Sequence, residues 1–183
     1  MDILIAGVGG QGTLLASRVL GKYALNNNLD CKLSEVHGMA QRGGSVITFV
    51  RMGEKINSPI IDTKGADIII AFEKLEALRY VHYLKDDGII LYSSQEIMPM
   101  PVVTGMAKYP EDIANQLPKA FCVDALTLAE SVGNVKCANS VMLGAFTKLM
   151  KLNKEDMEKA LRESIPEKML DINIKAFNLG YNA

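Results

Sequence analysis

Three glycines near the start of the chain have the spacing of a phosphate-binding turn. Gly7, Gly9 and Gly12 satisfy the pattern G-x-G-x-x-G, and the apolar run 3–6 before them is suited to a strand buried on both faces. Such glycines let a phosphate approach the backbone, and the helix that follows presents unpaired N–H groups. The candidate anion-binding residues are Gly7, Gly9, Gly10, Gln11 and Gly12. The alternative is a tight strand-to-helix turn without a ligand, because this pattern alone is weakly specific.

A second cluster, between residues 34 and 45, combines a histidine, an amide, an arginine and three glycines. A connection between two strands is normally short, whereas this one contains groups that can bind an anion. Gly43 and Gly44 can adopt backbone angles closed to other residues, so their N–H groups can converge on an anion. Arg42 offers a planar fork of donors. The candidate residues are His37, Gln41, Arg42, Gly43 and Gly44. The alternative is a glycine-rich turn with a solvated arginine and a histidine that caps a strand.

The glycine turn also permits a dinucleotide site. In a Rossmann enzyme, an acidic residue roughly 20 positions after the glycines ends the second strand and holds the ribose hydroxyls. Glu35 has that position relative to Gly12. No recognisable substrate domain and no catalytic His/Asp or Tyr/Lys pair follows it. NAD(P) is therefore an alternative ligand rather than the favoured one.

The cysteines and histidines indicate neither an iron–sulfur cluster nor a zinc site. Cys31, Cys122 and Cys137 are widely separated and odd in number, which is typical of reduced thiols in a cytoplasmic protein. A cluster held within one chain needs closely spaced cysteines, and only His37 and His82 are available to complete a zinc site. We therefore predict no metal site in this chain.

Length and charge narrow the class of protein. The chain has 183 residues, of which 49% are hydrophobic, and its net charge is −1. A chain of this length buries roughly 70% of its unfolded surface, so we expect a single domain over residues 1–183. The near-zero charge excludes a broad attraction to nucleic acid or to an anionic membrane. No apolar stretch approaches the ~20 residues of a membrane span, and Asp2 stands where a secretory leader would be basic.

Apolar strand-like runs alternate with amphipathic helical stretches, which is typical of an α/β protein. We predict strands at 2–7, 30–36, 46–51, 67–72, 88–92 and 120–123, and helices at about 11–26, from Leu75 to Leu84, and shortly after Pro110. We expect the stretch 93–105 to be irregular and the chain beyond 123 to be mostly helical. The expected fold is a three-layer α/β sandwich with a largely parallel, Rossmann-like sheet and helices on both faces.

Three residues in the second half of the chain have structural interpretations. Asp124, at a strand end, is interpreted as the cap of the next helix rather than as a ligand-facing group, and Asn153 also has the position of a cap. Gly144 lies in a predicted helix that starts near residues 139–140. Its missing side chain predicts close packing against another backbone, either within the chain or across a subunit boundary.

The two glycine clusters together resemble the gamma subunits or domains of the 2-oxoacid:ferredoxin oxidoreductases. Among them, the chain looks most like the beta subunits of the indolepyruvate type. The most specific part of the resemblance is the segment HGMAQRGGS at 37–45. The resemblance spans nearly the whole chain and also rests on residues 7–13, 34–36, 58–59, 66–67, 72–73, 76–77, 139–141, 143–145, 173, 175–177 and 180–181.

The resemblance implies a multi-subunit enzyme that oxidatively decarboxylates a 2-oxoacid to an acyl-coenzyme A. Two electrons pass through iron–sulfur clusters to ferredoxin, the acceptor of the complex. Thiamine diphosphate, Mg²⁺ and the [4Fe–4S] clusters are expected in partner subunits only, because this chain has no GDG…NN motif for thiamine diphosphate. We expect the two glycine loops to help hold coenzyme A or to close the active site, and no catalytic residue in this chain.

Other roles remain open at this point. The second loop could instead dock on the catalytic subunit, with Arg42 bonded to a carboxylate or carbonyl there. The chain could also be a free-standing NAD(P)-binding oxidoreductase, or a structural interaction subunit without a ligand. The sequence leaves the choice of 2-oxoacid undetermined.

Overall fold

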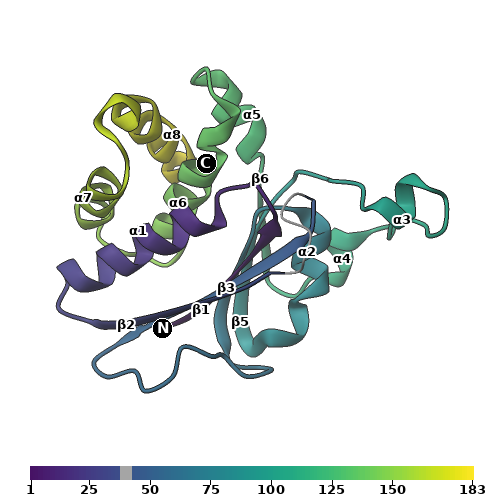
Figure 1. The fold of residues 1–183 in the computed structure, drawn as a ribbon, viewed down its shortest axis with the longest axis horizontal. Coiled ribbons are helices and arrows are strands. Elements are labelled where there is room, and N and C mark those ends of the chain that lie inside the picture. The colour runs from purple at the N-terminus through teal and green to yellow at the C-terminus, as the bar shows by residue number, and fades with distance from the viewer. Residues whose placement is uncertain (38–42) are drawn as a thin grey trace.

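The computed structural model describes residues 1–37 and 43–183, and its centre is one six-stranded sheet. The strands are β1 (Asp2–Val8), β2 (Asp30–His37), β3 (Ser45–Gly53), β4 (Ala66–Ala71), β5 (Leu84–Ser93) and β6 (Ala120–Val123). Their order is β2-β3-β1-β4-β5-β6 (Figure 1). The neighbours β1, β4, β5 and β6 pair in parallel, whereas β3 runs antiparallel to both β1 and β2. The prediction of a largely parallel sheet is confirmed.

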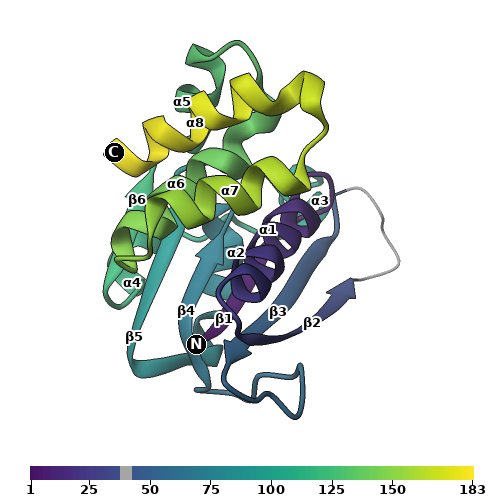
Figure 2. The same ribbon diagram turned by 90° about the vertical axis from the view of Figure 1, so that its left-hand side faces the viewer.

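Helices cover both faces of this sheet, which confirms the predicted three layers. One face carries α1 (Thr13–Asn26), α5 (Ala125–Ser131), α6 (Ala138–Leu149), α7 (Lys154–Ser164) and α8 (Leu170–Asn182). The opposite face is covered by α2 (Lys74–Arg79) and α4 (Ile113–Gln116), and α3 (Met100–Val103) lies in the segment between β5 and α4. The described residues also form three short 3₁₀ turns, η1 (Val81–Tyr83), η2 (Val135–Cys137) and η3 (Glu167–Met169). Figure 2 looks onto the face covered by α1, α6, α7 and α8.

The alternation of side chains along each strand divides the apolar residues between two cores. In β1, Ile3 and Ile5 face the α1 side, whereas Leu4 and Ala6 face the α2 side, and all four are fully buried. Burial on both faces explains why this strand is a continuous apolar run rather than an alternating one.

Two glycines bring α6 and α8 into backbone contact. A Cβ atom added at Gly144 would lie 2.0 Å from the carbonyl oxygen of Phe177, and one at Gly180 would lie 1.9 Å from that of Val141. No side chain fits at such distances. The close packing predicted for Gly144 is therefore present, and it occurs within the chain.

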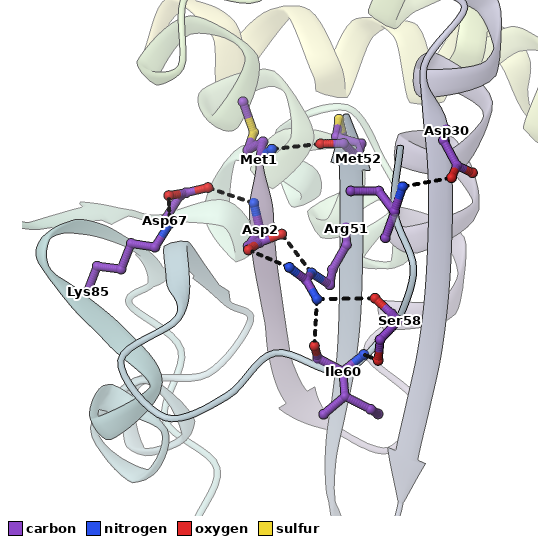
Figure 3. A network of polar contacts seen from close by, with 10 residues as sticks. Met1, Asp2, Asp30, Arg51, Met52, Ser58, Ile60, Asp67 and Lys85 are labelled. Carbon is purple, nitrogen blue, oxygen red and sulfur yellow. Dashed lines mark hydrogen bonds and ion pairs between the residues drawn. The ribbon is translucent and has the colours of Figure 1, made fainter. Parts of the chain in front are cut away.

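A polar network closes the sheet at the amino end of β1 (Figure 3). The Met1 ammonium donates to the Met52 carbonyl at 2.6 Å, and the Asp2 amide donates to the Asp67 carboxylate at 2.7 Å. Arg51 donates to both carboxylate oxygens of Asp2, at 2.9 and 3.2 Å. Further bonds run from Arg51 to the carbonyls of Ser58 and Ile60, from Lys85 to Asp67, and from the Ile56 amide to Asp30.

Two predicted element boundaries are wrong. The helix expected from Leu75 to Leu84 ends at Arg79, and Leu84 is the first residue of β5. Leu84 pairs with Ala66 and packs closely over Gly88, where a Cβ atom would lie 2.7 Å from the Leu84 side chain. Leu84 is therefore apolar because it is buried within a strand, not because it lies on the buried face of a helix. The stretch 93–105, which was expected to be irregular, contains the short helix α3.

Both predicted helix caps are confirmed. The Asp124 side chain accepts a hydrogen bond from the Thr127 amide at the start of α5, and the Asn153 side chain accepts one from the Asp156 amide at the start of α7. Hydrogen bonding by Thr127, through its side chain and then its amide, is the main reason that the pKa of Asp124 is lowered.

Candidate functional site

The glycine turn between β1 and α1 presents unpaired backbone N–H groups at the carboxyl end of β1. Gly10 and Gly12 have φ angles of 104° and 84°, which side chains disfavour. The carbonyl of Gly12 already accepts bonds from the first turn of α1. Within the described residues, the amides of Gly10, Gly12 and Thr13 donate no hydrogen bond. The turn can therefore offer several donors and a helix N-terminus to an anion.

Gln11 holds this turn in place through its side chain. Its Oε1 accepts from the Val8 amide at 2.7 Å, and its Nε2 donates to the Phe72 carbonyl and to Gln95 Oε1, both at 3.0 Å. The side-chain amide thus joins the ends of β1 and β4 and the segment after β5. The geometry makes Gln11 a positioning residue of the predicted site.

A cavity of about 490 Å³ opens beside the turn, at the carboxyl edge of the parallel strands. This edge is where open α/β sheets bind ligands. The glycine turn forms one wall through Gly10 and Gly12, and the start of α6 forms another through Asn139. Among the described residues of the lining, Lys136 is the cationic one.

The wall at the start of α6 is held by a buried polar chain. Asn139 Oδ1 accepts from the Ser140 amide at 2.8 Å, and the Ser140 hydroxyl donates to Asn173 Oδ1 at 2.7 Å. Asn173 in turn donates to the Met169 carbonyl at 2.8 Å. A Cβ atom at Gly12 would lie 2.4 Å from Asn139 Nδ2, so the third glycine of the motif is required by this packing.

A second cavity, of about 450 Å³, lies on the other side of the turn, between α1 and β2. Gly9, Gly10, Gly12, Glu35 and His37 contribute to its lining. Glu35 Oε2 is buried without a hydrogen-bond partner among the described residues, and so is the Oγ1 of Thr48, its cross-strand neighbour on β3. Glu35 lies inside β2 rather than at its end, and β3 separates β2 from β1. This order differs from the Rossmann sheet, in which the acidic strand lies next to β1.

The two glycine clusters meet at this edge. The Gly9 amide donates to the Gly44 carbonyl at 2.9 Å, and Ser45 pairs with Val8 at the ends of β3 and β1. Gly43 has a φ of 77°, as a left-handed glycine does. Gln41 and Arg42 lie outside the described residues.

Two buried glutamates anchor the segments around the turn: Glu73, which caps α2, and Glu76 within it. Glu73 and Glu76 are only 1% and 3% exposed. The Ser45 hydroxyl donates to Glu76 and lies 2.7 Å from the Tyr80 hydroxyl, and Arg79 donates to Glu76 at 3.0 Å. Burial raises the pKa of Glu76 despite these bonds.

Sequence reasoning missed several residues of this edge. From the sequence, no role is assigned to Lys136 or Gln95. Asn139 enters as a helix start and through the family resemblance, and Glu73 and Glu76 enter only through that resemblance. A usable signal existed for Gln95, which follows the end of β5 by two residues, because segments after parallel strands meet at one edge.

Neither a metal site nor a membrane helix is found in the part of the chain that the structure describes. No group of three or more His, Cys, Asp and Glu side chains there could hold a metal ion. No described helix is long and apolar enough to cross a membrane.

The fold and the site define a three-layer α/β protein with a glycine turn of unpaired backbone amides at the carboxyl edge of its sheet. Residues 2–183 match the sequence profile of the pyruvate ferredoxin/flavodoxin oxidoreductases. The chain belongs to this family, and the resemblance seen in its glycine clusters is confirmed.

Curated relatives match the chain along its whole length. Indolepyruvate oxidoreductase subunit IorB of Pyrococcus horikoshii is 41% identical, with 100% of this chain and 95% of the relative covered. The protein of that name from Archaeoglobus fulgidus is 39% identical, with coverages of 100% and 94%. Pyruvate synthase subunit PorC of Methanocaldococcus jannaschii is 28% identical, with coverages of 100% and 96%.

Solved structures share the fold. The keto/oxoacid ferredoxin oxidoreductase gamma subunit of Geobacter sulfurreducens has a TM-score of 0.76 and 26% identity, and the match covers 99% of this chain and 96% of that one. The 2-oxoglutarate:ferredoxin oxidoreductase of Magnetococcus marinus, solved with 2-oxoglutarate, coenzyme A and succinyl-CoA bound, has a TM-score of 0.79. It is 19% identical, and the match covers 100% of this chain and 30% of that one, so it shows the fold alone.

Proposed function

We propose that this chain is the small subunit of an indolepyruvate-type 2-oxoacid:ferredoxin oxidoreductase. The observation that carries the proposal is the full-length match to four proteins named indolepyruvate oxidoreductase subunit IorB, at 34–41% identity. Relatives named for ketoisovalerate, 2-oxoglutarate and pyruvate are 28–33% identical. An aryl 2-oxoacid is thus the proposed substrate class of the complex.

The complex decarboxylates the 2-oxoacid, forms an acyl-coenzyme A and passes electrons to ferredoxin. Thiamine diphosphate supplies the carbanion chemistry when it is bound in the catalytic partner, where Mg²⁺ and the [4Fe–4S] clusters also belong. This chain contributes binding and orientation, and it is not active alone. Its three cysteines lie on β2, β6 and η2 as free thiols, which supports a cytoplasmic location.

Within the complex, the glycine turn holds the phosphates of coenzyme A. The residues fit such a group: Gly10 leaves room for a close approach, and the unpaired amides of Gly10, Gly12 and Thr13 can donate to phosphate oxygens. Lys136 supplies a positive charge at the cavity beside them. Arg42 would add a fork of donors from the second loop, whose end at Gly44 is bonded to the turn.

Replacing Arg42 tests this role in the reconstituted complex. In R42A the KM for coenzyme A should rise about tenfold, as expected for the loss of a charge-assisted hydrogen bond, while the subunits still assemble. The matched control is R18A, which removes an exposed arginine from α1 and should change neither quantity. Unchanged assembly together with an unchanged KM in R42A would refute the proposed role. Weakened assembly with a normal KM would instead make the loop an interface element.

The free-standing NAD(P) enzyme is the second candidate, because Glu35 and the glycine turn line one cavity. Titration of the isolated chain with NADH, followed by nicotinamide fluorescence, separates the two. Saturable micromolar binding would favour the dinucleotide, whereas the proposed function predicts no saturable signal.

A further inference from the structure

An apolar arm, whose one charged residue is Lys108 at its end, projects from the edge of the sheet that carries the glycine turn. We define the arm as residues 98–108, between the end of β5 and α4. Figure 1 shows this segment, with α3, extending from the body at the right of the view. From Ile97 to Ala107 the sequence is IMPMPVVTGMA, without a charged residue. Apart from Thr104, the side chains of this stretch gain little from contact with water.

The arm carries a concentration of exposed large apolar side chains. Met100, Val103 and Met106 are 68%, 64% and 78% exposed, and Met98 is also exposed. Contiguous exposed apolar groups on a soluble chain mark an interaction site. Methionine suits such a site, because its flexible, polarisable side chain adapts to the surface that it meets.

The arm has a defined shape before any partner binds. The Thr104 hydroxyl and amide both donate to the Met100 carbonyl, at 2.9 Å each, and the Ala107 amide donates to the Pro101 carbonyl at 2.9 Å. The proline at position 101 also restricts the first turn of α3. A preformed arm pays little ordering entropy when it binds.

One buried carboxylate fastens both ends of the arm to the body. Glu73 Oε1 accepts from the Ile97 amide at 3.1 Å, just before the arm, and from the Tyr109 hydroxyl at 3.2 Å, just after it. The Lys74 amide also donates to the Gln95 carbonyl at 2.9 Å. Gln95 is bonded to Gln11, so the base of the arm is continuous with the glycine turn.

We propose that the arm docks into an uncharged apolar cleft of the catalytic subunit and seats the glycine-turn edge against it. This inference rests on the proposed function, which supplies a catalytic subunit. A specific interface buries about 800 Å² on each partner. An arm of eleven residues can supply only part of that area, so its partner must also contact the glycine-turn edge to which the base of the arm is bonded. The proposed function places the catalytic subunit, rather than a second copy of this chain, at that edge. The continuity of the arm with the cavity then places the partner at the cavity mouth.

The test is the affinity between this chain and the catalytic subunit of its own complex. In the double variant M100E/M106E the dissociation constant should rise at least 100-fold, because two carboxylates would enter an apolar cleft. The matched control is L25E, on α1, whose side chain is 63% exposed and lies outside the arm. The control should change the constant less than threefold. Both variants replace exposed residues, so their thermal unfolding should match that of the wild type.

Anaerobic hydrogen–deuterium exchange gives a second, independent reading. Exchange across residues 98–108 should slow at least tenfold in the complex, and exchange across the exposed loop 54–60, at the opposite end of the sheet, should not. An unchanged dissociation constant in M100E/M106E, or an equal effect of L25E, would overturn the docking arm while leaving the proposed function intact. A wild-type chain that dimerises through the arm would overturn it in favour of a second copy. Failure of the wild type to bind the catalytic subunit would refute both proposals.

Discussion

The two ends of the sheet differ in how fully their polar groups are satisfied. At the amino end, Asp2, Arg51 and Asp67 are bonded to one another or to Lys85, and the Met1 ammonium is bonded to the Met52 carbonyl (Figure 3). At the carboxyl end, backbone amides of the glycine turn and the Oε2 of Glu35 have no partner within the described residues, and two cavities open beside them. Unsatisfied groups cost stability. We infer that the amino end serves stability and that the carboxyl end is kept for a ligand or partner.

The largest loss of stability is expected for a substitution in the tight contact between α6 and α8. G180A would place a methyl group 1.9 Å from the Val141 carbonyl oxygen and force α8 away from α6. We expect the free energy of unfolding to fall by about 3 kcal/mol, at the upper end for overpacking. Urea denaturation of the isolated chain measures this change in the free energy of unfolding. The matched control is G21A in α1, where the nearest atom would be 3.4 Å away and stability should hold or rise. Equal effects of the two variants would contradict the close approach of α6 and α8.

Breaking the polar network at the amino end should lower the free energy of unfolding by somewhat less than G180A does. R51A removes bonds to Asp2, Ser58 and Ile60, and should lower the free energy of unfolding by about 2 kcal/mol. K55A, which removes an exposed lysine nearby, should change it by less than about 0.5 kcal/mol. In the complex, R51A should leave the KM for coenzyme A unchanged. A raised KM would show that the two ends are not separate in function.

Much of this difference between the two ends of the sheet could be predicted from local sequence, and part of it could not. The glycine turn was predictable because positive φ angles at Gly10 and Gly12 require that residue type. The cap at Asp124 was predictable because its hydrogen bond spans three residues. In contrast, the insertion of β3 between β2 and β1 depends on pairing over long sequence separations, which periodicity does not encode.

The cavity beside the turn was beyond sequence reasoning for the same reason. Its lining combines Gly12, Gln95, Lys136 and Asn139 from four separate segments. None of these residues has a distinctive local pattern except the glycine. Glu73 and Glu76 have no distinctive local pattern either, and only the fold shows that both are buried.

Two carboxylates, one near each end of the sheet, should respond to pH with opposite signs. Burial alone would raise the pKa of Asp67, but the bonds from Lys85 and the Asp2 amide outweigh it and lower the pKa. Its stabilising contribution is therefore present at neutral pH and is lost as pH falls through the folded-state pKa, below about pH 4. D67N should be less stable than the wild type by about 1 kcal/mol at pH 7, and the gap should close in acid.

Glu76 gives the opposite dependence. Burial raises its pKa, so the folded state favours the protonated form, and the contribution present below about pH 4 is lost as pH rises through the folded-state pKa. E76Q has no charge to bury, so its stability relative to the wild type should increase from pH 4 to pH 7. Denaturant titrations at three pH values measure both variants. Gaps that change in the same direction would contradict the contrast between the two ends.

The smallest expected effect concerns Lys136, which lines the cavity but is exposed. A solvated charge near a phosphate contributes little, so K136A should raise the KM for coenzyme A only about threefold in the complex. The effect should shrink as ionic strength rises, because salt screens exposed charges beyond roughly 10 Å at 0.1 M. K55A carries the same charge change at the amino end and should leave the KM unaltered at every salt concentration. If both variants changed the KM equally, the effect would come from net charge. Such a result would contradict the assignment of coenzyme A to the carboxyl end of the sheet. A salt-sensitive effect confined to K136A would instead place the anion at the cavity beside the glycine turn.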